Sequence, residues 1–259
     1  MEDSNYLNRK DLITRVISAI VLVISALYLN YIGKYYFFSV VSLASVVLLF
    51  EYYRLFNVTE LNVKFLVNIL FGLISLFFVY FSFYSYFFYT IFIGIILSLC
   101  IEKKAFALIP YLYFYVPLGA LLYLNSYIDG KLIIYWIFIV VWTVDISGYI
   151  FGKLLKGPKL IPSVSPNKTW SGFILGIFFS GIFSIFYAYS LDYNEFLKYF
   201  ILGLIGGVIS TAGDLFESKL KRINKKKDAS GLIPGHGGLL DRLDGFLFAI
   251  LYFWLLSLF

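Results

Sequence analysis

Residues 196–245 read FLKYFILGLIGGVISTAGDLFESKLKRINKKKDASGLIPGHGGLLDRLDG, an apolar run that passes directly into a polar one. The apolar part, 196–216, has the length of about 20 residues that a helix needs to cross a bilayer. The polar part, 213–245, carries acidic residues at both ends, with a basic run and a glycine-rich turn between them. Because polar segments of this length inside a compact chain are usually functional, we expect the chemistry of the protein here.

The rest of the chain is strongly apolar. Of its 259 residues 61% are hydrophobic and only 14% are charged, and the mean hydropathy is +0.87. Soluble domains carry about 25% charged residues, so repeated apolar runs of helix length predict an all-α, polytopic integral membrane protein. We expect about nine transmembrane helices, at 12–30, 35–56, 61–81, 84–100, 105–125, 132–151, 170–190, 196–216 and 243–259.

The basic residues predict the orientation of these spans. With a cytoplasmic N-terminus, all of the 21 Lys and Arg residues except Lys34, Lys131 and Lys198 fall on the cytoplasmic side. This asymmetry follows the positive-inside rule and predicts that the active site faces the cytoplasm. We expect the membrane to be the inner (plasma) membrane. The net charge of +6 therefore marks a membrane face, and we expect no nucleic-acid partner.

Polar residues divide the chain by role. Residues 1–125, with about five spans, carry few polar groups and are expected to be a scaffold. Residues 126–259, with about four spans, are expected to be the catalytic region, with cytoplasmic loops at 152–169 and 217–243.

Four aspartates lie near the predicted cytoplasmic ends of spans, namely Asp145, Asp214, Asp241 and Asp244. Ionisable groups at membrane depth are costly and are functional candidates, although Asp145 could instead be a lysine-paired carboxylate. Neighbouring carboxylates repel one another unless a cation lies between them. Mg²⁺ typically binds one or two carboxylates together with substrate phosphates, so the pattern predicts a phosphate-handling site.

Basic and small residues supply the matching phosphate contacts. Lys168 and Thr169 lead into a predicted helix, where Thr169 can act as the N-cap and the helix N-terminus favours anions. Lys221 and Arg222 follow Asp214 closely and are candidates for phosphate contact, whereas Lys226 is expected to lie in a solvated loop.

The turn LIPGHGGLL at 232–240 holds His236, the one histidine of the chain. Its glycines allow the backbone to approach phosphates closely. One histidine and one distant cysteine exclude a zinc site, and a GxxxxGK[ST] phosphate-binding loop is absent from the sequence.

The runs S-x-L-K-R, K-D and P-G-H-G-G-x-x-D-R-x-D within 218–244 resemble the signature of phosphatidate cytidylyltransferases, also called CDP-diacylglycerol synthases. The resemblance extends to Gly213-Asp214-Leu215 and S-P-x-K-T at 165–169, with Trp142, Asp145, Tyr149 and Gly152 further upstream, and covers roughly the C-terminal half. The chain has Ser171 where the family commonly has Glu, and Gly148 where it commonly has Ala.

The resemblance implies transfer of the cytidylyl group of CTP to phosphatidate in the cytoplasmic leaflet, giving CDP-diacylglycerol and pyrophosphate for phospholipid biosynthesis. It implies Mg²⁺ as cofactor, leaves a second cation open, and suggests a homodimer. The implied metal ligands are Asp214, Asp241 and Asp244, and the implied catalytic residues are Asp214, Asp241, Lys168, Lys221 and Arg222. The implied substrate-binding residues are Ser165, Thr169, Ser218, Lys227, Asp228, His236, Gly237, Gly238, Arg242 and Asp145.

Two alternatives remain at this point. A transporter with a re-entrant polar loop would carry its charged groups near the bilayer midplane. Another membrane phosphotransferase, acting on a CDP-alcohol or a polyprenyl phosphate, would also gather aspartates at the cytoplasmic face.

Overall fold

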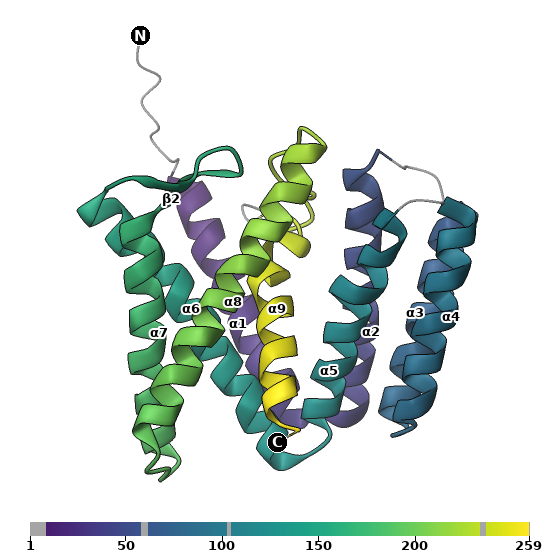
Figure 1. Cartoon of the computed structure of the whole chain (residues 1–259), viewed down its shortest axis with the longest axis horizontal. Helices are drawn as coiled ribbons and strands as arrows, with labels where there is room; N and C mark the ends of the chain where they lie inside the picture. Colours follow the sequence, from purple (N-terminus) through teal and green to yellow (C-terminus); the bar gives the residue numbers. More distant parts are fainter. Residues whose placement is uncertain (1–8, 58–61, 103–104, 234–236, 259) are drawn as a thin grey trace.

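Helices built from the apolar runs make up the body of the protein, as the computed structural model in Figure 1 shows. The structure describes residues 9–57, 62–102, 105–233 and 237–258. Within these ranges the α-helices are α1 (Arg9–Ile32), α2 (Lys34–Leu55), α3 (Val63–Tyr80), α4 (Tyr84–Glu102), α5 (Val116–Asn125), α6 (Ile128–Leu155), α7 (Trp170–Ser190), α8 (Phe196–Ile223) and α9 (Leu240–Leu256).

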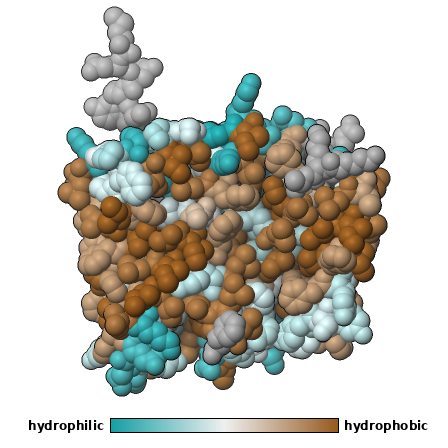
Figure 2. All heavy atoms as spheres, viewed as in Figure 1, coloured by the Kyte–Doolittle hydropathy of each residue, from teal (hydrophilic) through white to brown (hydrophobic). Residues whose placement is uncertain are grey.

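The predicted all-α, polytopic architecture is confirmed. Among the described residues, seven helical segments are long and apolar enough to cross a membrane, from Lys34–Leu55 to Phe196–Ile223. The apolar part of α1, Val23–Ile32, and the 17-residue α9 are shorter. Figure 2 shows apolar side chains across the middle of the visible face and hydrophilic ones at its two ends, as expected for a bundle surrounded by lipid.

The structure differs from the sequence expectation in three local features. The helices α6 and α8 extend to Leu155 and Ile223, so the segments that follow them are 156–169 and 224–239. A short antiparallel hairpin, β1 (Lys159–Ile161) and β2 (Ser165–Thr169), lies in the first of these segments. The expected span 105–125 is not one regular helix, because a 3₁₀ turn and the π-helical turn Pro110–Tyr115 precede α5.

Helices α6, α7, α8 and α9 pack in sequence order and position the polar segments at one end of the bundle (Figure 1). Small residues allow α6 and α7 to approach closely: a Cβ on Gly172 would lie 2.4 Å from the carbonyl oxygen of Gly148. The hydrophobic core continues through α2, α3, α5, α6 and α9. As a result the C-terminal ends of α2, α6 and α8 and the N-terminal ends of α7 and α9 lie on the same side, at the top of Figure 1.

Candidate active site

One face of α8 carries the polar residues of the site. Glu217 and Ser218 lie three and four residues after Asp214, and Lys221 lies four and three residues after them, so all four share one side of the helix. Glu217, Ser218 and Lys221 are buried. Because these polar side chains are buried, they need polar partners on neighbouring elements, and those contacts hold the C-terminal third of α8 in place.

A buried chain of charges connects α8 to α9. The Nζ of Lys221 lies 2.5 Å from Glu217 Oε2 and 2.6 Å from Asp241 Oδ1. The other carboxylate oxygen of Asp241 accepts hydrogen bonds from the N–H groups of Ala229, at 3.0 Å, and Gly238, at 2.7 Å. Asp241 thus ties together α8, the segment 224–239 and the start of α9.

Asp214 links α8 to the hairpin before α7. Its Oδ2 forms an ion pair with Lys168 of β2, and its Oδ1 accepts a hydrogen bond from Ser218 Oγ at 3.3 Å. The side chains of Lys168 and Asp214 remain 29% and 25% exposed, so this pair is accessible to a ligand.

Two further aspartates lie within electrostatic range of this pair. Asp244 of α9 accepts a hydrogen bond at Oδ1 from Gly245 N–H, at 2.7 Å, and the charges of Asp214, Glu217 and Asp145 act on it. Asp145 of α6 is itself within range of the charges of Asp214, Lys168 and Arg242. The structure therefore brings together Asp145, Lys168, Asp214, Arg242 and Asp244, which we call the charged cluster.

The carboxylates of the charged cluster suit a hard divalent cation only in part. No three His, Cys, Asp or Glu side chains in the described ranges are close enough together to hold an ion by themselves. Asp241 already uses both oxygens on Lys221 and two N–H groups. Asp214 is also engaged, by Lys168 and Ser218, but its ion pair is partly exposed, so Asp214 and Asp244 remain as candidates. One or two carboxylates completed by substrate phosphates form the usual Mg²⁺ environment.

Other predicted residues shape the loops around the charged cluster. Thr169 is the N-cap of α7, where its Oγ1 accepts a hydrogen bond from Gly172 N–H at 3.2 Å. Arg222 donates to the carbonyl oxygens of Val164, at 3.2 Å, and Lys226, at 3.0 Å, and so joins two loops.

The remaining predicted residues are distributed along the same two segments. Ser165 begins β2, Lys227 and Asp228 are exposed in the segment 224–239, and Gly237 has a positive φ of 87°. Residues 234–236, and with them His236, lie outside the described residues.

Lys226 is engaged away from the charged cluster. Its Nζ donates a hydrogen bond to the carbonyl oxygen of Arg54 at the end of α2. Burial and the positive charge of Arg54 lower the pKa of Lys226. This lysine therefore joins a loop to α2, which differs from the freely solvated side chain that the sequence suggested.

Sequence reasoning missed three residues that contact the site. Glu217 is buried beside Lys221. Its position four residues before Lys221 on one helix was the signal in the sequence for this ion pair. Glu51 of α2 is buried and binds the segment that leads into α9, and Tyr113 of the π-helical turn reaches the carbonyl oxygen of Asp244 at 3.5 Å. Local sequence carries no signal for the last two, because their partners lie more than 100 residues away.

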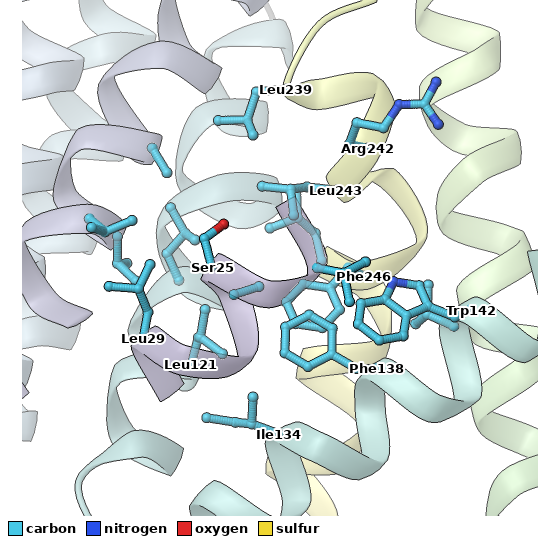
Figure 3. A pocket seen from close by; sticks show the side chains of 18 of the residues that line it. Ser25, Leu29, Leu121, Ile134, Phe138, Trp142, Leu239, Arg242, Leu243 and Phe246 are labelled. Carbon is cyan, nitrogen blue, oxygen red and sulfur yellow. The ribbon is translucent and has the colours of Figure 1, made fainter. Parts of the chain in front are cut away.

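A cavity of about 580 Å³ adjoins the charged cluster (Figure 3). Helices α1, α2, α5, α6 and α9 line it almost entirely with apolar side chains. Among them are the stacked rings of Phe138 and Phe246, whose centroids lie 4.6 Å apart. Asp145 and Arg242 also line the cavity, so it reaches the charged cluster.

The sequence is similar to known proteins along most of its length. A sequence model described as the cytidylyltransferase family matches residues 13–259. A phosphatidate cytidylyltransferase of Rickettsia typhi is 32% identical over 189 residues, which cover 68% of this chain and 83% of that protein. One of Rickettsia prowazekii is 31% identical over 202 residues, covering 73% and 89%.

A third relative supports the same assignment. A phosphatidate cytidylyltransferase of Staphylococcus aureus is 40% identical over 138 residues, which cover 52% of this chain and 53% of that protein. The family model covers almost the whole chain, and the Rickettsia typhi relative is matched over more than two thirds of its length. The chain therefore belongs to the cytidylyltransferase family.

Proposed function

We infer that the protein transfers the cytidylyl group of CTP to phosphatidate, releasing pyrophosphate and leaving CDP-diacylglycerol in the membrane. The observation that carries this inference is the junction of the charged cluster with the apolar cavity, which Asp145 and Arg242 both line. A lipid phosphate requires an apolar place for its chains beside a polar place for its headgroup. The cavity and the charged cluster supply these two environments next to each other.

We assign the headgroup contacts by charge and position. Arg242 would bind the phosphate of phosphatidate, because a guanidinium matches phosphate oxygens and this residue lines the cavity. Lys168, which neutralises Asp214 in this structure, would contact the phosphates of CTP when they arrive. An acyl chain would lie along the side chains of Leu121 and Phe138 within the cavity.

Asp214 and Asp244 would hold Mg²⁺ together with substrate phosphate oxygens, and the bound ion would supply charge neutralisation at the reacting phosphates. Asp241, which the sequence also predicts as a metal ligand, would instead position the start of α9 through Lys221 and Gly238. A second cation stays a prediction. Lys221 would act by neutralising Glu217 and Asp241 and so preserve the geometry of the site.

The reaction needs no side chain to remove a proton. The phosphate monoester of phosphatidate has a second pKa of about 6, by analogy with phosphoserine, so its oxygen is largely ionised near neutral pH. That oxygen forms a bond to the α-phosphorus of CTP, while the bond from that phosphorus to the β-phosphate oxygen breaks. The electron pair leaves with pyrophosphate. The charged cluster would act by orienting the two anions and by reducing their repulsion.

We propose that the charged cluster lies on the cytoplasmic side of the inner membrane. CTP is available on that side, and phosphatidate would occupy the adjacent leaflet. The concentration of lysines in 153–168 and 219–227 supports this orientation. A homodimer is a further proposal, which rests on the family resemblance alone.

The direct test is incubation of the purified protein in lipid–detergent micelles with phosphatidate, Mg²⁺ and CTP labelled at the α-phosphate. Label should enter the lipid fraction, and pyrophosphate should be released in equal amount. CTP labelled at the γ-phosphate is the matched control and should leave the lipid unlabelled. Failure to label phosphatidate of several acyl compositions would refute the proposed function.

The same assay distinguishes the two alternative functions. A CDP-alcohol phosphotransferase would consume CDP-diacylglycerol and an alcohol, and a transporter would produce no new lipid. Lys168, just before α7, and Asp244, in the first turns of α9, also place the charged cluster toward the end of the bundle where these helices begin, which disfavours a transport site at its middle.

A further inference from the structure

Glu51 is a fully buried carboxylate in a part of the chain that the sequence assigns to the scaffold. It lies one turn before the end of α2, with Leu48, Leu49 and Leu55 buried around it in the same helix. A buried carboxylate costs several kcal/mol unless hydrogen bonds or opposite charge compensate it. Its retention at this place therefore requires partners, and those partners indicate its role.

The partners of Glu51 belong to the segment that leads into α9. Its Oε1 accepts a hydrogen bond from Ser230 Oγ at 2.5 Å and one from Leu239 N–H at 3.0 Å, and its Oε2 accepts one from Leu240 N–H at 2.7 Å. The cap residue of α9 is Leu239, whose side chain makes no capping hydrogen bond. Glu51 thus caps α9 from another helix, where a negative charge also interacts favourably with the helix dipole.

The backbone next to this cap is shaped to admit the carboxylate. A Cβ on Gly238 would lie 2.6 Å from Glu51 Oε1, so a side chain at this position would displace Glu51. The N–H of Gly238 donates to Asp241 on the other side of the same turn. Glu51 and Asp241 therefore bind the turn at residues 238–240 from two sides and set the direction in which α9 begins.

We propose that Glu51 is a positioning residue for nucleotidyl transfer: it fixes the first turn of α9, and with it Arg242 and Asp244, relative to Asp214 on α8. This proposal rests on the proposed function of the charged cluster. It adds that α2, in the part of the chain expected to be a scaffold, helps to build the charged cluster through a buried carboxylate.

The substitution Glu51→Gln tests the proposal with little change of volume. A glutamine keeps one acceptor oxygen, while its NH₂ group cannot accept from the N–H group that faces it. We expect kcat to fall about 10- to 100-fold, because small displacements of reacting groups have effects of this size. The melting temperature should fall little, because the substitution also removes a buried charge.

An activity-independent measurement accompanies the kinetics. Amide hydrogen exchange of a peptide that spans residues 237–245 should be faster in Glu51→Gln than in the wild type, because the N–H groups of Leu239 and Leu240 lose an acceptor. If the wild type shows no cytidylyl transfer, the proposed function fails, while the exchange result still reports whether Glu51 holds α9.

Asn68→Leu is the matched control in the same half of the chain. Asn68 is buried and hydrogen-bonded to Tyr53 and Ser98, and neither partner belongs to the segment that leads into α9. This variant should lower the melting temperature while the folded protein keeps its kcat. If Glu51 had a purely structural role, kcat would depend on melting temperature in the same way in both variants. That result would overturn the proposal.

Ser230→Ala keeps the proposal testable if Glu51→Gln does not fold. It removes one donor to the same carboxylate, and kcat should fall severalfold in the same direction. Unchanged kcat, within twofold of the wild type, in whichever of the two variants folds would refute the positioning role. Unchanged amide exchange in Glu51→Gln would refute it equally.

Discussion

Removal of Lys221 should destabilise the protein strongly, because this lysine neutralises two carboxylates in a buried place. Its Nζ lies within 2.6 Å of both Glu217 Oε2 and Asp241 Oδ1, and the Glu217 side chain has no exposed surface. Breaking a buried ion pair by removing one partner costs about 3–5 kcal/mol. For Lys221→Met we therefore expect a fall in melting temperature on the order of 10 °C.

A second substitution should reverse much of this loss. In Glu217→Gln combined with Lys221→Met, the uncompensated charge at position 217 disappears, while Asp241 keeps its hydrogen bonds from Ala229 and Gly238. The double variant should recover more than half of the lost melting temperature. This recovery distinguishes charge compensation from a simple loss of packing, which a second substitution would increase.

Thermal unfolding in one detergent, followed by intrinsic fluorescence, compares the single and the double variant with the wild type. A melting temperature of Lys221→Met within about 2 °C of the wild type, which corresponds to roughly 1 kcal/mol, would refute the reasoning. So would a double variant as unstable as the single one. If Lys221→Met is stable but has lost CTP-dependent turnover, the result would support the phosphate contact that the sequence predicts for Lys221.

Three further predictions concern the site. Asp214→Asn and Asp244→Asn should each lower label transfer from CTP to lipid by about 100-fold or more, because each removes a proposed charged ligand for Mg²⁺; near-normal turnover in either would contradict the metal assignment. Ala44→Phe, at the cavity wall, should lower turnover of dipalmitoyl phosphatidate more than that of the dioctanoyl lipid, and an equal effect on both would argue against an acyl chain there. Lys226→Ala should keep turnover within twofold, since its side chain contacts Arg54 and not the charged cluster; a large loss would move the phosphate site toward 225–227.

Much of the fold follows from local features of the chain. Apolar runs of about 20 residues predict helices because an unpaired backbone polar group is very costly in lipid. The distribution of lysines predicts which ends of these helices lie together. For this reason Lys168, Asp214 and Asp244 could be chosen as site residues, although they come from three separate segments.

The sequence was less informative about the task of each charged residue. Lys221 and Arg222 follow Asp214 and were expected to contact phosphate, yet Lys221 is held by Glu217 and Asp241, and Arg222 joins two loops. A basic residue looks the same in a sequence whether its partner is a ligand or a buried carboxylate. The rotation of α8 about its own axis decides whether such a residue meets a ligand or a buried carboxylate. That rotation depends on the packing of α8 against α9.

By itself the sequence determined the class of the protein, and it predicted the membrane face of the polar groups and the residue types for phosphate binding, because hydropathy, charge asymmetry and motif spacing are local properties. The tertiary structure decided that Glu51, distant in the chain, caps α9, that Asp241 is engaged by Lys221, and that an apolar cavity meets the charged cluster. These facts depend on which helices pack side by side and in which rotation. Such contacts join residues far apart in the chain, so their free energies are not encoded in any one segment.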